Sequence, residues 1–99
     1  MRKKIPESHY RSCRVLGNPT AYEALKILGR KRMRPSQLAE ALGLSRATIS
    51  DVLRSLRQLD VVRYVTQENG KQYFIKDETI LDVMRALEHL VRNIRTREY

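Results

Sequence analysis

The segment LGLSRATISDVL, residues 42–53, constrains the fold more than any other part of this chain. Gly43 permits a sharp change of chain direction, and Ser45 belongs to the residue types that cap helix N-termini. Beyond the cap, apolar residues recur at the spacing of one helix face: Ile49, Val52, Leu53 and Leu56. The segment therefore predicts a tight turn followed by a helix that buries one side and leaves the other side polar.

A second amphipathic helix is predicted directly before this turn, from Pro35 to Leu42. Two short helices joined by Gly43-Leu44-Ser45 have the form of a helix-turn-helix, whose second helix can enter the major groove of DNA. The outward side of that second helix, residues 46–59, would place five residues near base edges: Arg46, Ala47, Ser50, Asp51 and Arg54. An ordinary helical hairpin without a DNA role is the alternative interpretation of the same pattern.

Two of these five residues have defined chemistry toward DNA. Arg54 can donate two hydrogen bonds to O6 and N7 of guanine. Asp51 carries a charge that phosphate repels, so it would either accept a hydrogen bond from a cytosine amine or orient Arg54. Because residues three apart on a helix are neighbours, the spacing favours the orienting role.

The apolar period changes from helical to extended after the second helix. Two stretches rich in β-branched and aromatic side chains, VVRYVTQ and KQYFIK, flank Asn69-Gly70, which suits a two-residue type I′ turn. The turn predicts a hairpin over residues 61–76, in which Tyr64 would pair with Ile75. We call this hairpin the wing, and we expect it to contact the DNA backbone or the minor groove.

The remaining segments divide the chain into three parts. Residues 1–7 form a basic arm, residues 8–76 a DNA-binding core and residues 77–99 a C-terminal helix. Within the core, a short first helix precedes one that begins at Asn18-Pro19, a capping side chain followed by proline at the first helical position. The expected fold is therefore mainly α with a small β-hairpin.

Positive charge is concentrated in the first part of the chain. The net charge is +9, and residues 1–59 hold 13 of the 20 Lys and Arg residues but only four acids. A basic surface of this kind attracts polyanions such as nucleic acid. The residues expected to contact the DNA backbone are Ser45, Thr48, Arg30, Lys31, Arg32, Arg34, Ser36, Arg63 and Lys71.

The C-terminal helix carries an apolar stripe too wide for the rest of so short a chain to cover. This stripe and one side of the first helix are therefore expected to meet a second copy of the chain. The residues assigned to the homodimer interface are Tyr10, Cys13, Ile80, Met84, Leu87, Val91 and Ile94.

Several classes of function are disfavoured by the composition. Cys13 is the only cysteine, so the chain has neither an internal disulfide nor an all-cysteine metal site. We recognise no nucleophile–histidine pair, no carboxylate pair in a cleft and no glycine-rich phosphate loop, so we expect neither an enzyme nor a cofactor. No signal peptide and no bilayer-spanning apolar run is visible, so we expect a cytoplasmic protein associated with the nucleoid.

Short motifs spread over residues 15–76 occur together in one family. They are Asn18-Pro19-Thr20, Leu38-Ala39, Leu42 to Ser45, Thr48-Ile49-Ser50 and the wing strand from Tyr73 to Ile75. With these motifs the chain resembles winged-helix regulators of the ArsR type. The resemblance implies a homodimer, formed through the N- and C-terminal helices, that binds an operator of two-fold symmetry.

The sequence departs from that family at the metal sites that some members carry. Arg34 and Ser36 stand where one cysteine pair would be. The ligand positions of the other site, on the last helix, fall on Asp82, Met84, Arg95 and Glu98. Two carboxylates without imidazole or thiolate make a poor zinc or copper site, so we expect no metal.

The expected function is sequence-specific binding of double-stranded DNA by a homodimeric transcriptional regulator, with repression as its mode. A sequence-tolerant chromatin or architectural protein on the same fold is one alternative, distinguished by the ratio of specific to non-specific affinity. A winged-helix module for protein assembly is another, distinguished by failure to bind duplex DNA at moderate salt.

Overall fold

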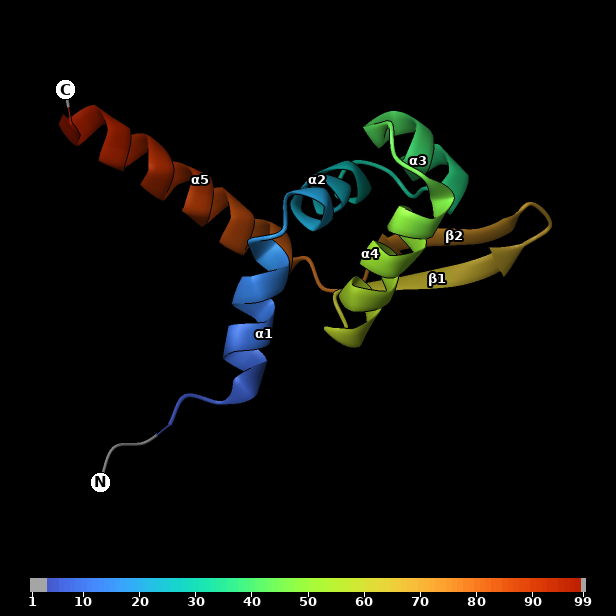
Figure 1. The fold of residues 1–99 in the computed structure, drawn as a ribbon, viewed down its shortest axis with the longest axis horizontal. Helices are drawn as coiled ribbons and strands as arrows, with labels where there is room; N and C mark the ends of the chain where they lie inside the picture. Colours follow the sequence, from blue (N-terminus) through green and yellow to red (C-terminus); the bar gives the residue numbers. More distant parts are fainter. Residues whose placement is uncertain (1–3, 99) are drawn as a thin grey trace.

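The computed structural model describes residues 4–98, so the first three residues of the predicted basic arm lie outside the described residues (Figure 1). The described chain forms, in order, α1 (Glu7–Leu16), α2 (Pro19–Leu28), α3 (Pro35–Leu42), α4 (Arg46–Gln58), β1 (Val62–Gln67), β2 (Gly70–Ile75) and α5 (Thr79–Glu98). The expected class, mainly α with one antiparallel hairpin, is confirmed.

The core lies where α2, α3 and α4 meet the two strands. Its largest fully buried side chains come from every one of these helices, from β1 and from α5: Leu25, Leu38, Ile49, Leu53, Leu56, Val62 and Met84. Helices α1 and α5 extend away from this body in different directions, and both chain ends lie on the side opposite the hairpin (Figure 1). The structure therefore has a packed centre and two projecting helices.

Met84 corrects one assignment made from the sequence. It was placed in the homodimer interface, because it continues the apolar stripe of the last helix. Its side chain is only 2% exposed in a single chain, where it belongs to the core cluster. Met84 is therefore part of the core, and the side chains available to a partner are its more exposed neighbours on α5.

The helix boundaries around the predicted turn are confirmed in detail. The side chain of Asn18 accepts a hydrogen bond from the backbone N of Ala21 at 3.0 Å, capping α2. Gly43 ends α3 in the left-handed conformation, with φ of 67°, which glycine adopts without a steric penalty. Ser45 Oγ then accepts from the backbone N of Thr48 at 3.1 Å and caps α4.

The register of the hairpin differs from the predicted one. Tyr64 pairs with Tyr73, not with Ile75, and the strands close through Gln67 opposite Gly70. Positive φ occurs at Gly70 and not at Asn69, so the turn is not type I′. A turn with negative φ followed by a glycine at positive φ is the common alternative. Because the partner shifts by two positions, each side chain still faces the expected side of the hairpin.

Within residues 4–98, no helix is both long and apolar enough to cross a lipid bilayer. The longest described helix, α5, carries charged residues between its apolar ones along its sequence.

Candidate nucleic-acid interface

The outward face of α4 is polar and exposed. Its opposite face buries Ile49, Leu53 and Leu56 against the core. This packing fixes how the helix is rotated, so the outer side cannot turn inward without exposing the core residues. All five residues predicted to face base edges are exposed on that outer side: Arg46, Ala47, Ser50, Asp51 and Arg54.

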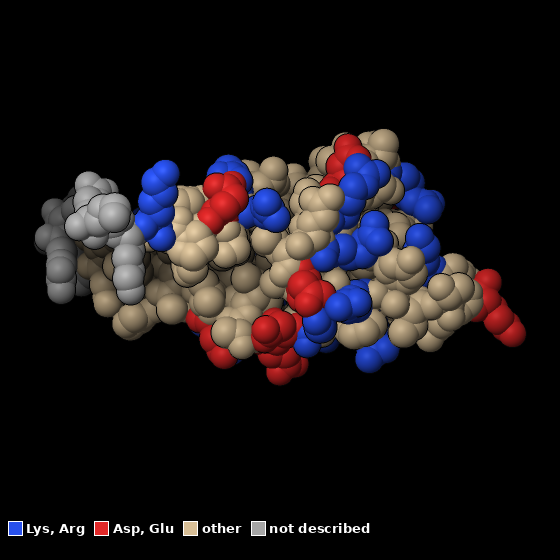
Figure 2. All heavy atoms as spheres, turned by 90° about the horizontal axis from the view of Figure 1, so that it is seen from below, with Lys and Arg blue, Asp and Glu red and all other residues tan. Residues whose placement is uncertain are grey.

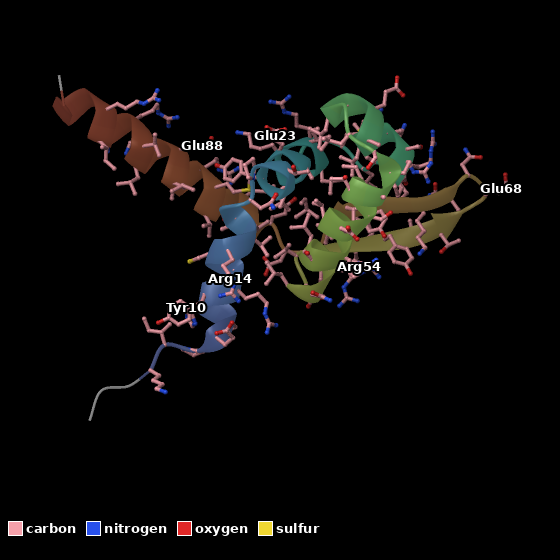
Figure 3. The ribbon with its side chains drawn as sticks, in the orientation of Figure 1. Tyr10, Arg14, Glu23, Arg54, Glu68 and Glu88 are labelled. Carbon is pink, nitrogen blue, oxygen red and sulfur yellow. The ribbon has the colours of Figure 1, made fainter. Side chains whose placement is uncertain are left out.

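An ion pair on this face orients the arginine predicted to read a base. Arg54 donates from Nη1 to Oδ1 of Asp51 at 3.1 Å, and both side chains are more than half exposed (Figure 3). The pairing of Asp51 with Arg54 that their spacing predicted is present, and the orienting role stays a prediction. A guanidinium group has five N–H donors, so this bond leaves several directed outward.

The N-terminus of α4 presents Ser45 and Thr48 together. Ser45 Oγ donates to Oγ1 of Thr48 at 2.9 Å in addition to accepting from the Thr48 backbone. Both residues are exposed. The positive end of the helix dipole lies here, where an anion such as phosphate is stabilised.

The basic loop, residues 30–34, is attached to the wing. Met33 and Tyr73 exchange two backbone hydrogen bonds, with N–O distances of 3.0 and 2.7 Å. The guanidinium carbon of Arg32 lies 4.4 Å from the centre of the Phe74 ring, a cation–π contact. Sequence analysis missed this attachment; the only signal for it was one apolar residue, Met33, within a run of basic ones.

Among the basic-loop residues predicted to contact the backbone, three are exposed: Arg30, Lys31 and Arg32. Arg34 is half-buried at the start of α3, and Ser36, one turn further, is exposed. The loop therefore presents exposed positive charges from a segment that is bonded to β2 of the wing.

The two predicted backbone contacts on the wing have different surroundings. Lys71, next to the turn, holds its Nζ atom 4.5 Å from the centre of the Tyr64 ring. Arg63, near the base of the wing, instead forms an ion pair with Asp60 at 2.7 Å. Glu68 occupies the tip, where its negative charge disfavours close approach of phosphate (Figure 3).

Asp60 is the junction between α4 and the wing. It has a φ of 63°, and Lys76 and Arg63 both pair with its carboxylate. The hydrogen bond from Lys76, together with the charge of Arg63, holds the pKa of Asp60 below its ordinary value. The charge of Arg63 is thus partly neutralised within the chain, unlike that of Lys71.

Figure 2 shows where the positive charge gathers on one face. Lys and Arg side chains are concentrated over the half of the molecule that holds α4 and the wing. The positive charge is therefore concentrated on the part of the molecule that contains α4 and the wing.

The projecting helices carry most of the large apolar side chains that remain exposed. Tyr10 and Cys13 are exposed on α1, and Leu87, Val91 and Ile94 on α5. Ile80 is only half-exposed and packs against the core. Val83 and Leu90, apolar residues that the sequence places alongside the stripe, were not assigned to the interface, yet both are exposed; Leu90 is 52% exposed. A groove of about 450 Å³ runs between α1 and the start of α5.

Among the residues that the structure describes, no three His, Cys, Asp or Glu side chains gather in a way that could hold a metal ion.

Comparison with known proteins finds a family to which the central part of the chain is similar. Residues 18–64 match the model of the bacterial regulatory protein arsR family. Over this segment the chain is similar to the ArsR family. The matched range runs from the cap of α2 through α4 into β1, so the resemblance inferred from the motifs is confirmed.

Solved structures share the winged-helix fold over most of this chain. NolR from Sinorhizobium fredii has a TM-score of 0.78 and 23% identity, and the match covers 91% of this chain and 96% of that one. An ArsR-like transcriptional regulator from Rhodococcus sp. RHA1 has a TM-score of 0.68 and 25% identity, covering 92% and 86%.

A third relative of known structure is a homodimeric winged helix-turn-helix DNA-binding domain from Mycobacterium bovis, a possible ArsR-family regulator. Its TM-score is 0.77 at 20% identity, and the match covers 94% of this chain and 85% of that one. A comparison with curated proteins gave no match. These solved structures and this chain share the fold.

Proposed function

We propose that this protein is a homodimeric regulator of transcription that binds double-stranded DNA by sequence. Helix α4 would lie in the major groove, and the wing would lie on the backbone or in the minor groove. The observation that carries the proposal is the outer face of α4, where Arg46, Ser50 and an Arg54 paired with Asp51 are all exposed.

The surrounding residues suit contacts to phosphate rather than to bases. Ser45 and Thr48 stand at the positive end of α4, and the basic loop is fixed beside the wing by the Met33–Tyr73 bonds. Such contacts position a protein on the duplex without reading sequence. Of the wing residues, Lys71 is the stronger candidate, because Arg63 is already paired with Asp60.

The homodimer rests on the apolar side chains that a single chain leaves exposed. The proposed interface is formed by α1 and α5 and contains Tyr10, Cys13, Ile80, Leu87, Val91 and Ile94, with Val83 and Leu90 added. The homodimeric relative from Mycobacterium bovis supports this assembly. Two-fold symmetry would direct the two α4 helices to two half-sites of a palindrome.

Repression is the proposed mode. A dimer bound across a promoter blocks the access of polymerase by occupancy alone, and the proposal requires neither metal nor cofactor. The protein would act in the cytoplasm, on the nucleoid.

Selection of bound sites from a random duplex library at physiological salt tests the proposal. We expect enrichment of a palindrome whose half-sites are about one helical turn apart, 34–36 Å. Sedimentation at increasing concentration should show a dimer. The salt dependence of binding should be measured on the selected sites and on random duplex, because phosphate contacts steepen it.

The same experiment separates the proposal from its alternatives. Binding without enrichment would indicate a sequence-tolerant architectural protein. Absence of duplex binding at moderate salt would instead indicate a protein-assembly module.

A further inference from the structure

Helix α5 is attached to the rest of the chain by its N-terminal half. Met84 is buried in the core, and Leu81 packs against it. Beyond the next turn, the apolar side chains Leu90, Val91 and Ile94 are all exposed, and Figure 1 shows this half of α5 far from the other elements. The direction of the projecting half therefore depends on contacts near its middle.

Three polar side chains make that contact, one turn beyond Met84. Tyr22 donates its hydroxyl proton to Oε2 of Glu88 at 2.5 Å, and Lys26 Nζ lies 3.0 and 3.2 Å from the two Glu88 oxygens. The Tyr22 hydroxyl is also 3.4 Å from the backbone O of Met84. We call this cluster, Tyr22 and Lys26 of α2 with Glu88 of α5, the α2–α5 clamp. Figure 3 labels Glu88.

The clamp keeps the same protonation state over a wide range of pH. The hydrogen bonds from Tyr22 and Lys26 lower the pKa of Glu88. Burial and the bond to Glu88 raise the pKa of Tyr22 to about 12. At neutral pH the carboxylate is therefore charged and the phenol protonated, as the bonds require.

Helix α2 is in turn fixed relative to the DNA-facing helix. Leu25 and Leu28 of α2 are buried in the same core cluster as Ile49 and Leu53 of α4. Any change in the angle between α2 and α5 is therefore a change in the angle between α4 and the proposed dimer interface.

We propose that the α2–α5 clamp determines the spacing between the two DNA-reading helices of the dimer. The inference rests on the proposed function, since it concerns a dimer assembled through α5. Ile94 lies about 9 Å along the helix axis beyond Glu88, at 1.5 Å per residue. A tilt of α5 at the clamp thus shifts the part of the interface that α5 carries and displaces the partner's α4.

Half-site spacing is sensitive to such a displacement. One added base pair moves a half-site by about 3.4 Å and rotates it by about 35° around the DNA axis. A rigid dimer binds both half-sites at once only when their spacing matches its own geometry. A loosely joined dimer binds DNA with several spacings, but its affinity for each is lower than that of a rigid dimer for the matching one. The clamp side chains are partly exposed, so their removal changes the fold's stability little.

The test uses Glu88→Ala, which removes both bonds of the clamp, and Tyr22→Phe, which removes one. Asp82→Asn is the matched control, because it also removes a negative charge from α5 but pairs only with Arg85 of the same helix. Two selected half-sites are placed at a series of spacings, and the affinity is measured for each. We expect Glu88→Ala to bind the preferred spacing about tenfold more weakly and the neighbouring spacings no more weakly than the parent.

A second readout needs no DNA. In a Cys13→Ser background, a spin label at Ser55→Cys on the exposed side of α4 reports the distance between the two α4 helices of the dimer. We expect a narrow distance distribution in the parent and in Asp82→Asn, and a broader one in Glu88→Ala. The exchanged pair Lys26→Glu with Glu88→Lys should restore part of the narrow distribution.

The outcomes separate the two proposals. An unchanged distance distribution and spacing profile in Glu88→Ala would overturn the role of the clamp while leaving the regulator intact. Weaker dimerisation in Glu88→Ala would overturn it too, because the cluster would then act on assembly. A parent chain that forms a dimer of defined geometry but selects no palindrome would instead overturn the proposed function.

Discussion

Asp51 and Arg54 lie one helical turn apart on the exposed face of α4, joined by a hydrogen bond of 3.1 Å between Oδ1 and Nη1. Because the carboxylate occupies one edge of the guanidinium, the remaining N–H groups are held in a limited set of directions. A preoriented donor loses less freedom on binding than a mobile one.

Replacing Arg54 with alanine should relax specificity at one base step. We expect a loss of about 1–3 kcal/mol at the selected site, because a bidentate contact to guanine is removed. Affinities for duplexes that differ at each position of the half-site measure this. An unchanged base preference would show that Arg54 does not read a base.

Asp51→Ala should weaken discrimination at the same base step as Arg54→Ala. If Asp51 acts by orienting Arg54, the double variant should lose no more than Arg54→Ala alone, since coupled residues are not additive. Additive losses, or a changed preference at a different base pair, would favour the alternative contact with a cytosine amine.

Lys71→Ala should lower affinity uniformly across sequences. The loss should be about threefold, and the slope of log affinity against log salt should fall by about one, as for a single phosphate contact. Glu68→Gln, at the wing tip, is the opposite control and should raise affinity for all sequences. A loss confined to particular sequences after Lys71→Ala would assign that residue to base recognition.

Met84 and Leu90 should separate folding from assembly, although both belong to one apolar stripe. Met84→Ala should destabilise the chain by about 2–5 kcal/mol, measured by urea unfolding, because it leaves a cavity in the core. Leu90→Glu should weaken the dimer by about 2 kcal/mol or more in sedimentation while the helical content stays the same. His89→Glu, on the polar side of α5, should affect neither; a monomer in that variant would mean that the interface lies elsewhere.

The charge of Asp60 should stabilise the wing junction in a pH-dependent manner. Its pKa lies lower in the folded chain than the ordinary value of 3.8. The stabilisation is therefore complete above that ordinary value and is lost as the pH falls through the lower, folded value. Asn tolerates positive φ, so Asp60→Asn removes the charge with little backbone strain.

We expect the parent chain to have the higher free energy of unfolding near neutral pH, and the difference from Asp60→Asn to shrink as the pH falls below 3.8. Urea unfolding over a series of pH values measures both. A difference that stays constant into strong acid would mean that the carboxylate acts through its shape and not its charge.

Local signals account for the parts of the fold that could be predicted. Asn18, Gly43 and Ser45 each satisfy the backbone of their own helix end, and the structure uses all three as expected. The turn of the wing also depends on a local signal, the Asn69-Gly70 pair. That pair is compatible with two turn types, whose central residues differ by one position along the chain. The register was therefore wrong, although the hairpin was right.

The features that sequence analysis missed join residues far apart in the chain. Tyr22 and Glu88 are 66 residues apart, and the Met33–Tyr73 bridge likewise spans most of the core. An apolar pattern shows which face of a helix is buried but not which polar side chains meet across it. Individual assignments to bases or phosphates stay predictions, because a contact depends on the shape of the partner as well as on exposure.

The apolar stripe that α5 leaves in water has a quantitative consequence for gene dosage. A chain that recognises its operator only as a pair is limited by how often two copies meet. While most copies are single and the operator is mostly free, operator occupancy scales with the square of the protein's concentration, so a twofold rise in concentration gives about a fourfold rise in occupancy. Changes in translation or proteolysis would then be enough to switch the controlled genes, without any small-molecule signal.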